Sequence, residues 1–95
     1  YQKAMSDPHH TRRKRLLYQA THRGFREADF AIGGFAAAHL AAMTGEELDA
    51  FEALLAFPDH DLYAWIAGTM EPPQEAAGPM LERMRAFDVS ALTAP

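Results

Sequence analysis

Residues 25–43 read FREADFAIGGFAAAHLAAM, and this stretch decides the fold. Its inward-type positions return every three or four residues, at Phe25, Ala28, Ile32, Phe35, His39 and Met43. That spacing is the period of an α-helix. The other sides of the stretch also carry mostly Phe, Ala and Gly, so the predicted helix is apolar nearly all round. Such a helix is stable only when other elements cover it, and we therefore expect it to be the central helix of a bundle.

Two glycines, Gly33 and Gly34, fall in the middle of this predicted helix. Each glycine in a helix interior costs about 1 kcal/mol relative to alanine. We therefore expect another element to pack closely against the pair, with the third or fourth helix of the chain as the candidate.

A helix is also predicted before the central one, because Asp7 and Pro8 have the order of an N-cap and a first helical residue. This first helix should run to about His22, with Gly24 as a left-handed stop. Its apolar stripe consists of Leu16, Leu17 and Ala20.

Three more helices are predicted after the central one. Thr44 and Glu47 have the spacing of a capping box, and the third helix that they begin should end before Pro58. Asp59 is predicted to cap a fourth helix that ends at Gly68, and a fifth should run from Gln74 to about Phe87. Their inward positions are Leu48, Phe51, Leu54 and Leu55; then Leu62, Tyr63, Trp65 and Ile66; then Met80, Leu81, Met84 and Phe87. No segment alternates with the strand period, so the expected fold class is all-α, a small single-domain bundle of five helices.

The length of 95 residues is that of one domain. Met5 followed by Ser6 and Asp7 resembles a natural start, so residues 1–4 are expected to be a remnant that precedes it. We expect residues 1–10 to form a flexible N-terminal segment that includes this remnant, residues 11–88 to form the five-helix domain, and residues 89–95 to form a flexible C-terminal tail.

The charges are divided unevenly along the chain. The total is −4 at pH 7, but the part through Arg26 carries +6 and the part from Glu27 onward carries −10. The basic N-terminal part could therefore steer towards an acidic partner surface. The absence of cysteine excludes disulfide scaffolds and thiolate metal sites and is compatible with a reducing cytoplasm. The longest uncharged run, Phe30 to Gly45, is too short and too polar to cross a bilayer, so no membrane insertion is expected.

Catalytic and metal-binding chemistry find little support in the residues. Of the five histidines, His22, His39 and His60 lack a second histidine three or four positions away, the spacing that metal ligands on one helix need. The serines, Ser6 and Ser90, lie in the predicted tails, where a nucleophile could not be held in place. We therefore expect no metal site, no catalytic residue and no enzyme.

The run Thr11-Arg12-Arg13-Lys14-Arg15 allows three interpretations: a nucleic-acid patch, a protein-facing patch or a solvated helix face. Nucleic-acid binding needs a broad basic surface and usually stacking aromatic residues. The rest of this chain is acidic and its aromatic residues fall on core stripes, so a protein-facing patch is favoured over nucleic acid.

The most informative stretch is His22-Arg23-Gly24-Phe25-Arg26-Glu27-Ala28-Asp29, which is polar, charged or glycine at most positions. In one interpretation Gly24 admits the backbone of a partner while Arg23 and Glu27 contact it. In the other, Gly24 ends the first helix and Arg23 and Glu27 form a weak surface salt bridge. The residues alone favour the second interpretation.

Arg23-Gly24-x-x-Glu27 after a short basic helix, with Asp29 two residues on, resembles the hallmark of the succinate dehydrogenase FAD assembly factors, the flavinators. A second stretch agrees: TGEELDAFEALL at 44–55, followed by DHDLYAWI at 59–66, is similar to the third helix of the family and its Asp-x-Asp-Leu-aromatic-x-Trp segment. The resemblance covers about Arg12 to Gly68. Ala28 stands where leucine is common and His60 where proline is expected, which bears on packing more than on function.

The resemblance implies a five-helix bundle that binds the flavoprotein subunit of succinate dehydrogenase, or fumarate reductase, and promotes covalent attachment of FAD to a histidine of that subunit. Carried over by position, Arg23, Gly24 and Glu27 are the partner-facing motif. The further residues expected to contact the partner are His22, Arg26, Asp29 and Arg15. The chemistry would belong to the partner and its flavin, so this chain should bind no cofactor stably.

With the resemblance included, a bacterial cytoplasmic protein that is monomeric when free is expected. A helical nucleic-acid-binding or regulatory module that uses Arg12 to Arg15 is the alternative, and a small metal-dependent or acid–base enzyme is a third interpretation.

Overall fold

The computed structural model describes residues 8–87, and within this range five helical rods pack into one bundle without a β-strand. The rods are α1 (His10–Thr21); a composite rod of α2 (Arg26–Ala28), η2 (Asp29–Gly33), α3 (Gly34–His39) and η3 (Leu40–Ala42); α4 (Gly45–Leu55); α5 (Asp59–Ala67); and α6 (Pro79–Ala86). The predicted all-α class is thereby confirmed. The predictions for residues 1–7 and 88–95 fall outside the described residues, and the domain boundaries stay predictions.

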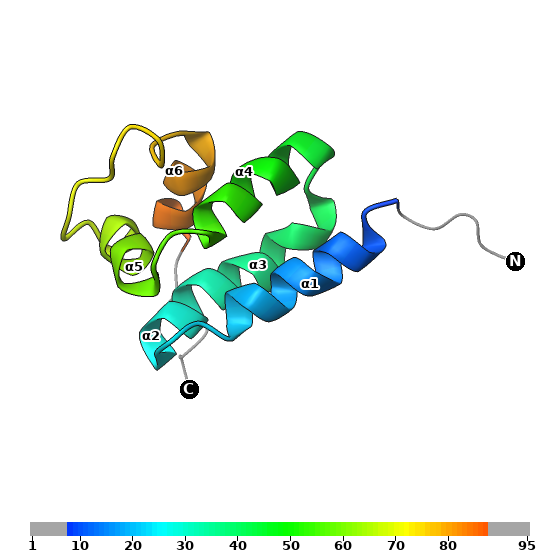
Figure 1. The fold of residues 1–95 in the computed structure, drawn as a ribbon, viewed down its shortest axis with the longest axis horizontal. Coiled ribbons are helices and arrows are strands. Elements are labelled where there is room, and N and C mark those ends of the chain that lie inside the picture. The colour runs from blue at the N-terminus through cyan, green and yellow to red at the C-terminus, as the bar shows by residue number, and fades with distance from the viewer. Residues whose placement is uncertain (1–7, 88–95) are drawn as a thin grey trace, which may run out of the picture.

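The composite rod lies at the centre of the bundle, as its sequence predicts. Figure 1 shows α1 beside the composite rod, with α4 packed against α1 on one side of the pair. Phe35 is buried in the core, where its ring centroid lies 5.9 Å from those of Phe51 and Phe87. The rod is not covered on every side, however, because Phe30 is 41% exposed and Ala37, Ala38 and Ala41 are also exposed.

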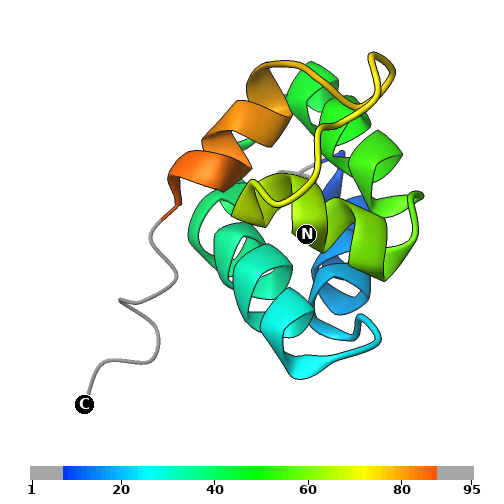
Figure 2. The same ribbon diagram turned by 90° about the vertical axis from the view of Figure 1, so that its left-hand side faces the viewer.

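The composite rod departs from a regular α-helix in its middle. Residues Asp29–Gly33 form a π turn, and Leu40–Ala42 form a 3₁₀ turn. The expectation that another element packs closely here is confirmed for Gly33, but its close neighbour is Thr21 at the end of α1 and not the third or fourth helix. Figure 2, turned by 90°, shows the same two rods lying side by side.

The limits of α1 also differ from the prediction. The helix begins at His10, and the predicted cap Asp7 lies outside the described residues. Leu16 and Ala20 are buried, but Leu17 is 38% exposed and belongs to the surface. The helix ends at Thr21, and Gly24 does not have the positive φ of a left-handed stop. The residue at the C-terminal cap of α1 is His22, not Gly24.

The next two helices follow the sequence closely. In α4 the Thr44 hydroxyl accepts a hydrogen bond from Glu47 N–H, and the Glu47 carboxylate accepts one from Thr44 N–H, so the capping box is confirmed. Gly68, with φ +82°, ends α5 as predicted. Asp59 is not the cap of α5, because Pro58 occupies the capping position and the Asp59 carboxylate bonds elsewhere.

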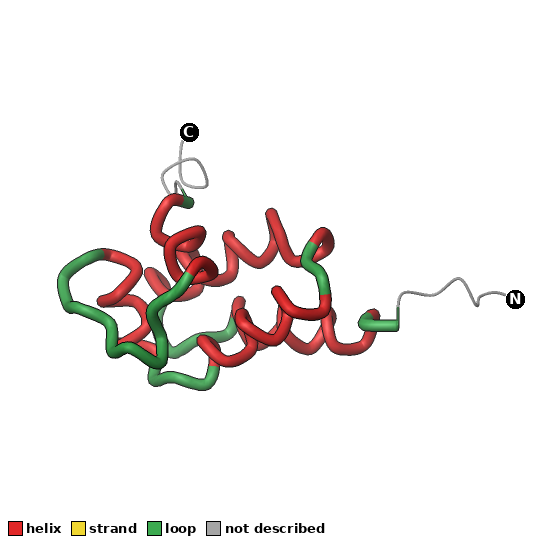
Figure 3. Tube along the Cα trace, turned by 90° about the horizontal axis from the view of Figure 1, so that it is seen from above, coloured by secondary structure: helices red, strands yellow, loops and turns green. Residues whose placement is uncertain are grey.

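The last helix, α6, starts five residues later than predicted. Residues 74–76 form a turn in which Ala76 and Ala77 N–H donate to the Pro73 carbonyl, and Pro79 takes the first helical position. The segment between α5 and α6 is therefore a loop, drawn green in Figure 3. Met80, Leu81 and Met84 face the core as predicted.

Candidate functional site

The predicted motif begins in the turn between α1 and α2, which we call the 22–25 loop, and ends at Glu27 in α2. His22 closes α1: its Nδ1 atom donates to the Tyr18 carbonyl at 2.9 Å, and its ring stacks on Tyr18 with centroids 3.9 Å apart. Phe25 closes the other end, with its ring stacked on His60 of α5 at 4.5 Å. The loop is thus held between two aromatic stacks.

Arg23 is turned into the protein, and its side chain is only 8% exposed. Its guanidinium donates to the Leu55 and Phe57 carbonyls, each at 3.0 Å, and Nη2 lies 2.7 Å from Asp59 Oδ1. These contacts tie the loop to the junction of α4 and α5 because one planar group bonds several acceptors at once. The alternative surface salt bridge between Arg23 and Glu27 is wrong, since the ionic partner of Arg23 is Asp59.

The loop backbone is held by two carboxylates from different elements. Asp29 Oδ1 accepts from Arg23 N–H at 2.6 Å, and Asp59 Oδ2 accepts from Gly24 N–H at 2.5 Å. Such charge-assisted bonds are stronger than bonds between neutral groups. Asp29 is half-buried. It is expected to contact the partner, and in the structure its carboxylate also bonds the backbone of the loop within the chain.

Four of the predicted residues form the outer face of this region: His22, Gly24, Arg26 and Glu27 are all exposed. Gly24 thus lies at the surface of the junction, as a place in a partner-facing motif requires. Glu27 makes no hydrogen bond or ion pair with another side chain in residues 8–87. An exposed carboxylate of this kind, in the short helix α2 that follows the fixed loop, is available to a partner.

A groove of about 550 Å³ opens beside the loop, between the ends of α1 and α4 and the start of α5. It connects the motif with residues that the sequence analysis did not assign to the site. The residues that line it are Tyr18, Gln19, His22, Arg23, Glu52, Leu55, Ala56, Phe57 and Asp59. The available signal was the second stretch of the resemblance, which contains Glu52, Leu55 and Asp59.

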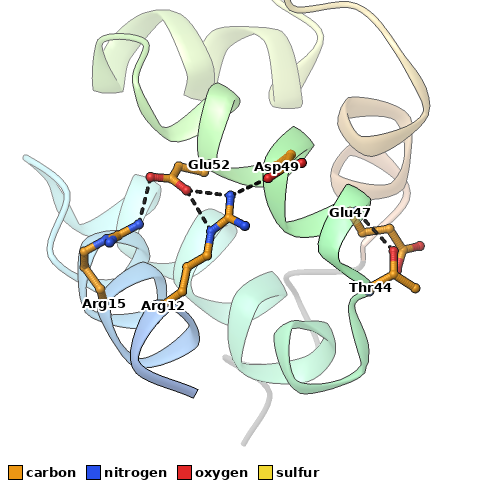
Figure 4. Close-up of polar contacts among 6 residues, drawn as sticks. All are labelled: Arg12, Arg15, Thr44, Glu47, Asp49 and Glu52. Carbon is orange, nitrogen blue, oxygen red and sulfur yellow. Dashed lines mark hydrogen bonds and ion pairs between the residues drawn. The ribbon is translucent and has the colours of Figure 1, made fainter. Parts of the chain in front are cut away.

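Arg15, the remaining predicted contact residue, lies on α1 and faces α4. Figure 4 shows its guanidinium beside Glu52, with which it forms an ion pair at 2.8 Å. Arg12 pairs with the same carboxylate and with Asp49, each at 2.7 Å. The hydrogen bonds that Arg12 donates to Asp49 and Glu52 raise the pKa of Arg12 above its ordinary value, and the bond to Asp49 contributes most.

The ion pairs change the interpretation of the basic segment. Its charge is partly balanced by α4, so the basic and acidic parts of the sequence meet inside the same molecule. Phosphate contacts need free cations, so the nucleic-acid alternative loses support.

No cluster of three potential metal ligands occurs within residues 8–87, and none of the helices described there is long and apolar enough to cross a membrane.

The fold and the site together define a small all-α protein, with a polar loop fixed at the junction of three helices. The profile of the family described as flavinator of succinate dehydrogenase matches residues 14–88. This chain therefore belongs to the flavinator family, and the resemblance seen in its sequence is confirmed.

Two relatives place the chain within the family more closely. The FAD assembly factor SdhE of Acetobacter pasteurianus is 48% identical over 73 residues, which are 77% of this chain and 67% of that protein. The mitochondrial succinate dehydrogenase assembly factor 2 of Candida glabrata is 51% identical over 55 residues, 58% of this chain and 36% of that protein. The chain thus spans about two thirds of the bacterial relative and about a third of the fungal one.

Proposed function

We propose that this chain binds the flavoprotein subunit of succinate dehydrogenase, or of fumarate reductase, and promotes covalent attachment of FAD to a histidine of that subunit. Membership of the flavinator family supports the proposal. The observation that carries it to particular residues is the exposed Glu27 carboxylate of α2, directly after the 22–25 loop that Arg23 and Asp59 hold from within.

The chain acts in this proposal as an accessory factor. The bond-forming chemistry is supplied by the flavin and the histidine of the partner, and this chain binds no cofactor stably. Its contribution is to hold the partner with flavin and histidine close together in a reactive arrangement, an effect worth up to several kcal/mol without a catalytic side chain. A rigid loop suits this role because little ordering free energy is lost on binding.

The proposed partner face consists of Gly24 and Glu27 with the exposed His22 and Arg26, and it extends to Arg15 on α1. Asp29 and Arg23 contribute mainly from behind, through their bonds to the loop and to the α4–α5 junction. The bacterial relative at 48% identity supports a bacterial protein, and a cytoplasmic location and a monomeric free state belong to the same proposal.

The test mixes the purified chain with the apo flavoprotein subunit and FAD and measures acid-stable flavin on the denatured partner. The wild type should raise the rate of covalent attachment, and Glu27→Ala should reduce that effect by about tenfold or more while its unfolding midpoint stays close to wild type. Glu46→Ala is the matched control, because Glu46 is also exposed but lies at the far end of α4 from the loop.

Two results would overturn the proposal. Equal rates of flavin attachment with and without the wild-type chain would show that the chain does not promote the attachment. Equal rates for Glu27→Ala and Glu46→Ala would remove Glu27 from the working site.

A further inference from the structure

Asp59 lies 35 residues from Gly24 in sequence but directly behind it in space. One oxygen of its carboxylate accepts from Gly24 N–H at 2.5 Å, and the other lies 2.7 Å from Arg23 Nη2. The carboxylate therefore bonds two consecutive residues of the 22–25 loop, one through the backbone and one through the side chain.

Position 24 has little room for a side chain, and the cause is a neighbouring atom and not the backbone conformation of Gly24. In residues 8–87 the glycines with positive φ are Gly68 and Gly78, so an alanine could adopt the backbone of Gly24. A Cβ atom at position 24 would, however, lie 2.7 Å from Asp59 Oδ2. A side chain there requires the carboxylate, which Arg23 also holds, to shift away from the loop.

We propose that Asp59 is the positioning residue of the partner-facing loop, and that its carboxylate is what requires glycine at position 24. The inference rests on the proposed function only in taking the loop to face the partner. It differs from the view that Gly24 is needed to admit the backbone of a partner, because here the glycine makes room for a carboxylate of its own chain.

The first test is a cycle of unfolding midpoints for the wild type, Gly24→Ala, Asp59→Ala and the double variant. Gly24→Ala alone should lower the midpoint by about 5 °C or more. In the Asp59→Ala background the same substitution should have almost no effect, because the atoms that it would displace are gone. An equal loss in both backgrounds overturns the inference.

Gly68→Ala is the control for this cycle. Its φ of +82° strains any alanine, whatever residue stands at position 59. Position 68 lies nine residues along α5, about 13 Å, so its effect should be the same in both backgrounds. If Asp59→Ala does not fold, Asp59→Ser also removes the atoms near Gly24 and gives the same comparison.

The second test separates positioning from simple loss of stability. Each variant is titrated against the apo flavoprotein with FAD at a temperature at which it is folded. Asp59→Ala should raise the half-saturating concentration by about tenfold and leave the maximal rate of flavin attachment nearly unchanged, because a disordered loop weakens binding and Asp59 does not touch the reacting atoms. Asp61→Ala is the matched control, since Asp61 shares the first turn of α5 and makes no hydrogen bond or ion pair with another side chain in residues 8–87.

An unchanged half-saturating concentration for folded Asp59→Ala would overturn the positioning role. If the wild type itself fails to promote flavin attachment, the proposed function is wrong, yet the midpoint cycle still decides whether Asp59 requires glycine at position 24. The two failures are therefore distinguishable.

Discussion

Gly33 of η2 lies directly against Thr21, the last residue of α1. A Cβ atom at position 33 would come within 2.8 Å of Thr21 Cγ2 and 3.0 Å of Thr21 Cα, and within 3.1 Å of the Ala20 carbonyl oxygen. Two of these three atoms belong to backbone, which cannot move aside as a flexible side chain can. The contact brings α1 against the composite rod just before the 22–25 loop, so it also sets where the loop begins.

Gly33→Ala should therefore destabilise the protein by about 1–3 kcal/mol, the usual cost of overpacking a tight interior contact. Gly45→Ala is the control, because a Cβ there would meet only the His9 ring, at 3.3 Å, in the first turn of α4. Urea denaturation of both variants measures the difference. A Gly33→Ala variant as stable as the wild type would show that α1 can move away without cost.

The core makes a second prediction through Trp65. Trp65 is 4% exposed, and its ring packs edge-on against Phe57 with centroids 5.0 Å apart. Trp65→Ala should cost about 3–5 kcal/mol, because it leaves a large cavity next to the α4–α5 junction. Met70→Ala, at a residue 44% exposed, should stay within about 0.5 kcal/mol of wild type. Equal thermal midpoints for the two variants would contradict a core role for Trp65.

The capping box of α4 predicts a pH dependence of stability. The hydrogen bond from Thr44 N–H is the main cause that lowers the pKa of Glu47 below its ordinary value of 4.5, and Arg83 contributes in the same direction. A lowered folded pKa means that the charged carboxylate stabilises the fold above pH 4.5, and this contribution is lost as the pH falls through the folded pKa.

Glu47→Gln should accordingly be less stable than wild type at neutral pH, and the difference should shrink as the pH is lowered below 4.5. Thermal midpoints of both proteins across this range measure it. Glu46→Gln is the control, because Glu46 makes no hydrogen bond or ion pair with another side chain in residues 8–87. A difference between Glu47→Gln and wild type that is constant with pH would exclude the charge of Glu47 as its cause.

Local patterns predict the helices well because their causes are local. The apolar spacing of residues 25–43 and the Thr44–Glu47 capping box act within one or two turns, and both are found in the structure. The start of α6 is predicted too early because nothing in the Gln74–Ala77 sequence forbids a helix, whereas Pro79 offers a better first position.

The internal side of the site is not predictable in this way. Asp59 stands at the start of α5, where N-capping is the obvious local role, and its actual contacts lie 35 and 36 residues away. Arg23 is likewise expected, from the family resemblance, to face the partner. Its burial depends on the Leu55 and Phe57 carbonyls, which only the packing of α4 and α5 brings into reach.

The two arginines of the motif region provide the last prediction, because they have the same chemistry and opposite surroundings. Arg23→Ala removes the donors to Leu55 and Phe57 and leaves Asp59 without its ionic partner, so it should cost about 3 kcal/mol. Arg26 is exposed and makes no hydrogen bond or ion pair through its side chain in residues 8–87, so Arg26→Ala should change stability by less than about 0.5 kcal/mol. Urea denaturation gives both free energies, and covalent flavin on the partner gives the functional effect. Arg26→Ala should lower the rate of flavin attachment mainly at low salt, as expected for an exposed charge at an interface.

Arg23→Lys should recover only part of the lost stability, because an ammonium group cannot reproduce the planar set of bonds. An Arg23→Ala variant as stable as Arg26→Ala would show that the buried guanidinium does not hold the loop in place.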